Sequence, residues 1–244
     1  LFAAYNLAKK GHQVSLYEKS TVLGGQMRLA AVPPGKGDIT QMVRNYIALC
    51  YKYHVDLHVG QAVDEGMIKE INPDVLILAT GATPLVPPIT GVDHCLHAID
   101  VLDGQSQCGK KTLVIGGGLV GCETADYLAN RGYDVTLIEA KDDIAGDIVS
   151  EHRIFLMESF KENHVKVYTQ SPVQSISENS VEIEHNGCLE TFSGFDSIVL
   201  ALGSKANQPF KENLVKEQYV IGDAIKARRA IDALREAREV IIKI

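Results

Sequence analysis

The chain contains two copies of one sequence pattern, and this repeat constrains its fold more than any other feature. Leu7–Glu18 (LAKKGHQVSLYE) and Leu128–Glu139 (LANRGYDVTLIE) share leucine, alanine, glycine, valine, leucine and glutamate at a constant offset of 121 residues. Further along, Asp74–Gly81 (DVLILATG) resembles Asp196–Gly203 (DSIVLALG) at an offset of 122. Self-similarity of this kind indicates a structural unit that occurs twice.

A third match lies between these two. His54–Leu57 (HVDL) resembles His164–Val167 (HVKV) at a smaller offset, which implies that the first copy has a longer excursion, around Pro33–Gly35. Three matches in the same order are difficult to obtain by chance. We therefore expect two related domains in one polypeptide, and 244 residues accommodate two domains of ordinary size.

The second copy carries a complete nucleotide-binding pattern. The short β-rich segment Thr112–Ile115 precedes Gly116–Gly121 (GGGLVG), and the helical pattern Cys122–Asn130 follows it. Glu139 ends the next expected strand, 18 residues after Gly121. Strand, GxGxxG loop, helix and acidic residue thus occur in the order that a Rossmann-type dinucleotide fold requires.

Each part of this pattern has a physical role. Gly116 permits the tight turn, Gly118 lets the backbone approach a pyrophosphate, and Gly121 lets helix and strand pack closely. The pyrophosphate is expected at the helix N-terminus, because unpaired N–H groups and the helix dipole favour an anion there. Glu139 can accept from a ribose hydroxyl and would repel a 2′-phosphate, which favours NADH, although Lys141 leaves NADPH open.

The first copy begins inside the same pattern. Subtracting 121 from its three glycine positions gives −5, −3 and 0, so the phosphate-binding loop of this copy is expected immediately before Leu1. Leu1–Lys10 reads as a helix interior with no cap before it, and we expect a fragment of a longer protein. Glu18 ends the second strand of this copy, where a carboxylate can accept both hydroxyls of an adenosine ribose.

The remaining segments predict elements that complete the two domains. The pair Gly24–Gly25 lets the backbone pass close to a cofactor, with an ordinary turn as the alternative. Gly37–Tyr53 reads as a mainly helical segment with one apolar face, and Val75–Ala79 as a strand buried on both faces of a parallel sheet. Val173–Phe192 has short alternating strands around Asn186–Gly187, which is typical of an antiparallel hairpin.

Near the C-terminus, Tyr219–Ala224 (YVIGDA) predicts a strand that runs into a Gly-Asp pair, and Arg229–Ile244 predicts a helix. In isolation a Gly-Asp pair is usually only a turn. At the end of a doubled dinucleotide fold, Asp223 can accept hydrogen bonds from the ribityl chain of a flavin. The following helix can direct its N-terminus towards the flavin ring.

Composition argues against several classes of function. The net charge is −7 and no basic block is present, so nucleic acid is not an expected partner. The longest apolar runs have the length of a strand, which argues against a membrane span, and no secretory signal is visible. The five cysteines form no CxxC pair and no metal-ligand spacing. A reduced, cytoplasmic setting without a metal site is the expectation.

The predicted fold class is α/β, with two Rossmann-like, three-layer dinucleotide-binding domains. The segments that end in Gly81 and Gly203 read as crossings between the domains, so an NAD(P)H-binding domain, residues 108–204, is expected as an insertion. The FAD-binding domain then comprises residues 1–107 and 205–244, without its first strand and its GxGxxG loop.

Together these residues resemble the C-terminal half of the old-yellow-enzyme-type flavoproteins related to 2,4-dienoyl-CoA reductase and NADH:flavin oxidoreductase. The likeness runs nearly end to end. It rests on Tyr17–Ser20 (YEKS), Leu23–Gln26 (LGGQ), Ala31–Lys36 (AVPPGK), Leu78–Ala82 (LATGA), Gly116–Glu123 and Ile221–Ala224 (IGDA). In that family an N-terminal (β/α)₈ barrel carries FMN and substrate beside a 4Fe-4S cluster. The resemblance implies that electrons pass from NADH through FAD to such a barrel, absent from this chain.

The resemblance also assigns residues to each cofactor. It implies that FAD is faced by Glu18, Lys19, Gly25, Gln26, Thr80, Gly81, Gly222 and Asp223, with the backbone at Val63 meeting the adenine. It implies that the nicotinamide cofactor is faced by Gly116, Gly118, Leu119, Val120, Gly121, Glu139 and Gly203. Glu123 matches a glutamate near the nicotinamide carboxamide in related reductases; the alternative is a helix residue that faces a neighbouring element.

The expected activity is hydride transfer from NADH to FAD, which needs orientation rather than an acid–base side chain, so no catalytic residue is assigned. Two alternatives stay open. A disulfide reductase of the thioredoxin-reductase kind would need two cysteines that can bridge beside the flavin, and no CxxC is present. A non-catalytic module could hold ADP instead of FAD, as in trimethylamine dehydrogenase, but Gly222 and Asp223 favour flavin.

Overall fold

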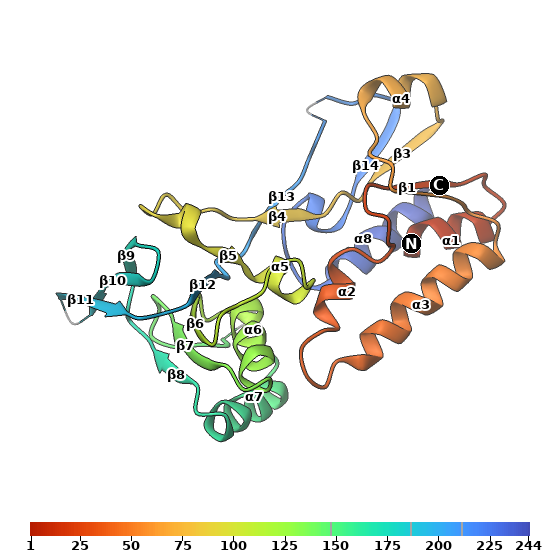
Figure 1. The fold of residues 1–244 in the computed structure, drawn as a ribbon. Coiled ribbons are helices and arrows are strands. Elements are labelled where there is room, and N and C mark those ends of the chain that lie inside the picture. The colour runs from red at the N-terminus through yellow and green to blue at the C-terminus, as the bar shows by residue number, and fades with distance from the viewer. Residues whose placement is uncertain (147, 186, 211) are drawn as a thin grey trace. The chain divides into compact units, whose positions relative to one another are not determined.

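The computed structural model describes residues 1–146, 148–185, 187–210 and 212–244, and it divides into two compact units (Figure 1). The first unit comprises residues 1–31, 36–83 and 204–244, and the second comprises residues 32–35 and 84–203. The second unit is thus contributed largely by one segment that interrupts the first. The predicted α/β, Rossmann-like fold is confirmed.

The second unit is built on a parallel sheet with strand order β5-β12-β6-β7-β8. Strands β9, β10 and β11 form a separate antiparallel sheet. The elements of this unit are η1 (Val92–His94), β5 (Leu96–His97), α5 (Ala98–Leu102), β6 (Lys111–Ile115), α6 (Leu119–Ala129), β7 (Asp134–Ile138), α7 (Ser150–Glu162), β8 (Lys166–Tyr168), β9 (Val173–Ile176), β10 (Ser180–His185), β11 (Cys188–Ser193) and β12 (Ser197–Leu200).

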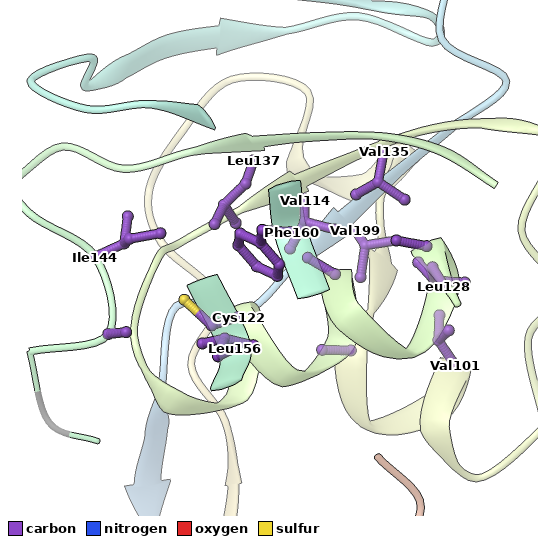
Figure 2. Packing of buried hydrophobic residues seen from close by; sticks show 14 residues of the cluster. Val101, Val114, Cys122, Leu128, Val135, Leu137, Ile144, Leu156, Phe160 and Val199 are labelled. Atoms are coloured by element: carbon purple, nitrogen blue, oxygen red, sulfur yellow. The ribbon is translucent and has the colours of Figure 1, made fainter. Parts of the chain in front are cut away.

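The strands of this parallel sheet alternate their side chains between two cores. Val114, Leu137 and Val199 pack with α6 and α7 around Phe160, as Figure 2 shows. The intervening residues, such as Leu113, point to the opposite face and pack with the antiparallel sheet. Burial on both faces explains why these strands read as continuous apolar runs in the sequence. The unit therefore has three layers: helices, parallel sheet and antiparallel sheet.

The first unit contains two short parallel sheets, β1–β2 and β14–β3, and a pair of strands, β4 and β13. Helix α8 packs against α1, and its buried residues join a core with Ile221. The elements of this unit are α1 (Phe2–Lys9), β1 (Ser15–Glu18), α2 (Gln26–Ala30), α3 (Gly37–Lys52), β2 (Asp56–Val59), α4 (Glu65–Ile71), β3 (Val75–Leu78), β4 (Ala82–Pro84), β13 (Ser204–Ala206), β14 (Glu217–Val220), η2 (Gly222–Ala224) and α8 (Ala230–Lys243).

The internal repeat is confirmed in the backbone. His54 precedes β2 with a φ of +57°, and His164 precedes β8 with a φ of +55°, an uncommon conformation for residues other than glycine. In both units the residue after this histidine donates its N–H to the carbonyl five residues back, at 2.9 Å. Helix, left-handed turn and parallel strand therefore follow one another in the same geometry twice.

Two expectations differ from the structure. The sequence places a domain boundary at residue 107, but residues 84–107 pack with the second unit, because β5 extends the parallel sheet beside β12 and α5 contributes to its core. The sequence also predicts that Val75–Ala79 is buried on both faces. Val75, Leu76 and Ile77 are only half-buried, because β14 is the only described strand paired with β3.

The predicted hairpin is present on the described residues. Strands β10 and β11 run antiparallel with His185 opposite Cys188, and Gly187 between them has a φ of +76°. Asn186 lies outside the described residues. Across the described part of the chain, no helix has both the length and the apolar character that a bilayer crossing needs.

Candidate dinucleotide-binding sites

The glycine-rich loop of the second unit connects β6 to α6. Gly116 has a φ of +108°, and a Cβ at this position would lie 2.6 Å from the carbonyl oxygen of Ala201. A Cβ on Gly121 would lie 1.8 Å from the carbonyl oxygen of Gly116. Both positions therefore require glycine, and the tight turn and the close approach of helix to strand are confirmed as features of the backbone.

The next residues form the start of α6. Gly118 precedes the helix with a φ of −74° and a ψ of −174°, a conformation that any residue can adopt. The backbone itself therefore does not require glycine here, and close approach to a pyrophosphate stays a prediction. Leu119 and Val120 open the first turn, and Val120 is exposed. An anion would meet the N–H groups of this turn.

Glu139 follows β7, and its carboxylate accepts hydrogen bonds from two backbone segments. One oxygen accepts the N–H of Gly117 at 2.5 Å, and the other accepts the N–H of Lys141 at 2.8 Å. A Cβ on Gly117 would lie 2.6 Å from Ile144 Cγ2 and 2.9 Å from Glu139 Cβ. Loop and carboxylate therefore form one local structure at the carboxyl end of the sheet.

Two further residues predicted to face the nicotinamide cofactor lie in this unit. Glu123 is half-buried on α6. Gly203 follows β12, is exposed, and has a φ of +88°; its carbonyl accepts the N–H of Leu85 at 3.0 Å. The contacts of both residues with a cofactor stay predictions.

The first unit repeats the geometry of the strand-end glutamate. The carboxylate of Glu18 accepts the N–H of Ser20 at 2.8 Å, the same distance as the equivalent bond at Glu139. The carbonyl of Glu18 accepts the N–H of Gln61 at 3.0 Å, and that of Glu139 accepts the N–H of Ser171 at 2.9 Å. Each unit thus has a glutamate at the end of its strand, with one carboxylate bond and one carbonyl bond in common.

The other residues predicted near the adenosine and the flavin lie on loops of this unit or, for Gln26, at the start of α2. Lys19 is exposed, and Val63 is half-buried in the loop after β2. Gly25 has a φ of +50°, and a Cβ there would meet nothing within 4 Å. The side-chain amide of Gln26 donates to the carbonyl of Ala82 at 3.2 Å. Open space beside Gly25 is compatible with a ligand.

Thr80 and Gly81 follow β3 and form hydrogen bonds with Asn207, the residue after β13. The hydroxyl of Thr80 donates to the carbonyl of Asn207, and the carbonyl of Gly81 accepts the N–H of Asn207 at 2.9 Å. Gly81 has a φ of +71°, and a Cβ there would meet nothing within 4 Å. These bonds fix the backbone at the carboxyl end of β3.

Gly222 and Asp223 form the turn after β14. Gly222 has a φ of +66°, and its N–H donates to a carboxylate oxygen of Glu236 at 2.6 Å. Asp223 Oδ1 accepts the N–H of Arg228 at 3.1 Å, and the guanidinium of Arg228 forms an ion pair with Glu236. The predicted flavin contact therefore belongs to a hydrogen-bonded network.

The structure brings the predicted residues together in two groups, one in each unit. All those assigned to FAD lie in the first unit, and all those assigned to the nicotinamide cofactor lie in the second. Sequence reasoning missed Gly117, Arg228 and Glu236. The available signals were the middle glycine of the run Gly116–Gly118 and an acidic residue on the apolar side of the last helix.

The five thiols are dispersed along the chain. All five cysteines are without a disulfide; Cys50 and Cys122 are buried, and Cys188 is exposed. Burial, with a smaller contribution from the negative charge of Asp93, raises the pKa of the Cys95 thiol to about 11. Among the residues that the structure describes, no group of three histidine, cysteine or carboxylate side chains could hold a metal ion.

The chain belongs to the pyridine nucleotide-disulphide oxidoreductase family, whose pattern it matches over residues 1–227. It is 38% identical over 243 residues to the bilirubin reductase of Mediterraneibacter gnavus. This match covers 97% of this chain and 37% of that protein. It is 36% identical over 253 residues to the NADH oxidase of Thermoanaerobacter brockii, covering 99% of this chain and 39% of that protein.

A solved structure gives the same picture. The complex of 2-naphthoyl-CoA reductase with 2-naphthoyl-CoA superimposes with a TM-score of 0.94 at 28% sequence identity, over 100% of this chain and 38% of that one. The chain thus spans less than two fifths of the length of these relatives. Family and fold together define an FAD/NAD(P)-dependent oxidoreductase domain.

Proposed function

We propose that the first unit binds FAD, that the second binds NADH, and that the chain passes reducing equivalents from NADH to FAD. When both cofactors are bound, the nicotinamide would supply a hydride that the flavin can accept. The observation that carries this proposal is the repeated strand-end glutamate. In both units its carboxylate accepts the N–H of the residue two positions later, and its carbonyl accepts an N–H from the segment after the neighbouring strand. A ribose-binding carboxylate is needed once for each dinucleotide.

The second unit fits a nicotinamide dinucleotide. Gly116 and Gly121 leave no room for a Cβ, so α6 begins close to β6, and its N-terminus is where a pyrophosphate would bind. Glu139 would accept from the adenosine ribose. Its negative charge opposes the 2′-phosphate of NADPH, which supports NADH as the preferred donor.

The first unit fits FAD rather than ADP. An ADP-binding module needs a ribose and pyrophosphate site but no residue for a ribityl chain. Asp223 stands at the end of β14, where a network of four residues maintains its turn. The chain retains this arrangement, which supports flavin as the ligand.

We further propose that the chain is the FAD- and NADH-binding part of a longer reductase of the old-yellow-enzyme-like 2,4-dienoyl-CoA reductase type. The length of the relatives supports this, because more than three fifths of each lies outside the match. In this proposal a barrel domain with FMN and a 4Fe-4S cluster receives the electrons. In the second unit β6 lies between β7 and β12, and the equivalent strands of the first unit are β1 and β3. This comparison supports a further strand between the sheets β1–β2 and β14–β3.

Disulfide reduction is not proposed. That chemistry needs two thiols that can form a bridge. Cys50 and Cys122 are buried, and a thiol with a pKa of about 11, such as Cys95, carries little thiolate at neutral pH.

The test is the substitution Glu139→Ala in the full-length protein. Removal of a charged acceptor should raise the Kd for NADH roughly tenfold to a hundredfold, and it should leave FAD binding unchanged. Glu190→Ala is the matched control, since Glu190 is exposed on β11 of the same unit. Calorimetric titration measures both affinities. An NADH Kd unaffected by Glu139→Ala would exclude this site.

A further inference from the structure

Glu236 occupies an uncommon position for a carboxylate. It lies on α8 beside Ala237, which packs with Ile221 and Val240 in the core of the first unit. The side chain of Glu236 is only 17% exposed. A carboxylate with so little access to water needs partners that compensate for its lost hydration.

Both partners of Glu236 belong to the segment that carries the turn after β14. One carboxylate oxygen accepts the N–H of Gly222 at 2.6 Å. The other pairs with the guanidinium of Arg228, whose side chain is 30% exposed. The backbone N–H of Arg228 in turn donates to Asp223 Oδ1 at 3.1 Å. One carboxylate on α8 therefore holds the turn on both sides of Asp223.

Contacts besides those of the Glu236 carboxylate also restrict the turn. Gly222 has a φ of +66°, and a Cβ there would lie 3.2 Å from Cβ of Ala233, which is one helical turn before Glu236. The carbonyl of Ala224 accepts the side-chain amide of Gln208 at 2.7 Å. The face of α8 that bears Ala233 and Glu236 thus sets the position of the turn.

We propose that Glu236 is a positioning residue for the flavin end of FAD, acting through Gly222, Arg228 and Asp223 without touching the cofactor. This inference rests on the proposed binding of FAD to the first unit. The adenosine end is assigned to Glu18, whose bonds involve Ser20 and Gln61 instead. Loss of Glu236 should therefore weaken the binding of FAD and leave the binding of ADP nearly unchanged.

The experiment compares the two ligands in the full-length protein after its flavin has been removed. Glu236→Ala is expected to raise the Kd for FAD roughly tenfold to a hundredfold, as loss of hydrogen bonds to a charged group does, with the Kd for ADP within about twofold. Glu236→Gln keeps an acceptor for the N–H of Gly222 and should give an intermediate FAD affinity. Glu239→Ala is the control, because Glu239 is exposed on the same helix.

Two results would overturn the inference. FAD affinity unaffected by both Glu236 variants would show that the turn does not need the carboxylate. An equal loss of FAD and ADP would show a general structural role. If Glu236→Ala does not fold, the Kd values of Glu236→Gln test the inference. The expected result is then an intermediate affinity for FAD and an unchanged affinity for ADP. Failure of the unsubstituted protein to bind FAD is a separate result, because it refutes the proposed function before any variant is compared.

Discussion

At the residue scale, the glycine-rich loop of the second unit depends on positions where a methyl group has no space. A Cβ on Gly117 or Gly121 would fall within 3.0 Å of a side chain or of the backbone. Real Cβ atoms do not tolerate such distances, so a substitution at Gly121 must move the start of α6, and one at Gly117 must displace Ile144 and Glu139. The loop then loses both its packing and its bond to Glu139.

Gly121→Ala is therefore expected to destabilise the protein by about 1–3 kcal/mol through overpacking, and to weaken NADH binding. Gly146→Ala is the matched control, because a Cβ on Gly146 would meet nothing within 4 Å. Urea unfolding followed by circular dichroism gives the stabilities. Equal stability of the two variants would contradict the packing seen between α6 and β6.

The thiols give a second prediction at this scale. The pKa of about 11 leaves roughly one Cys95 thiol in a thousand as thiolate at pH 8, whereas Cys188 is exposed. Alkylation at pH 8 should label Cys188 well before Cys95, and Cys95 should become reactive only as the pH approaches its pKa. Mass spectrometry locates the label. A thiol count that rises after reduction by NADH would instead favour a disulfide reductase.

The sequence identifies those site residues whose roles are local. Gly116 and Gly121 follow from spacing, because a tight turn and a helix start are determined within a few residues. Gly117 could not be predicted in this way, since its partner Glu139 is 22 residues away. The same holds for Glu236, which reaches Gly222 across 14 residues and a turn.

At the element scale, a buried polar contact connects α6 to α7. Asp126 is 8% exposed, and its carboxylate accepts hydrogen bonds from Ser159 and from Asn130. Burial raises the pKa of Asp126, and these two hydrogen bonds oppose part of that rise. The folded state therefore favours the protonated, neutral form of the Asp126 carboxyl group.

This shift sets the pH dependence of stability. Because the pKa of Asp126 is higher in the folded state than in the unfolded state, its contribution to stability is fully present below the unfolded pKa and is lost as the pH rises through the folded pKa. Asp126→Asn removes the titration. The free energy of unfolding of this variant minus that of the parent protein should therefore increase with pH over this range. Urea titrations at several pH values measure it, and a constant or falling difference would contradict the burial of the carboxylate.

Elements with strong periodicity are predictable from the sequence, whereas their surroundings are not. The helix expected at 229–244 occurs as α8, and the strand expected at 112–115 occurs within β6. The limited burial of β3 could not be read from its apolar run, because burial depends on which strands lie beside it. The boundary at residue 107 failed for a similar reason, since β5 is only two residues long.

At the scale of the whole molecule, the chain consists of two units built on one repeated pattern, and it matches less than two fifths of the length of the bilirubin reductase and the NADH oxidase. Each unit holds a glutamate after its strand by equivalent backbone bonds. We propose that the two units bind FAD and NADH, one dinucleotide each, and that reducing equivalents pass between these cofactors.

The most direct test adds NADH, without oxygen, to the full-length protein loaded with FAD, and follows the visible absorbance of the oxidised flavin. The account predicts that NADH bleaches the FAD absorbance, and that Glu139→Ala shifts the bleaching to higher NADH concentration. Chromatography of the released ligands distinguishes FAD from any FMN. FAD that stays oxidised while NADH is bound, or a released ligand that is only colourless adenine nucleotide, would contradict the account.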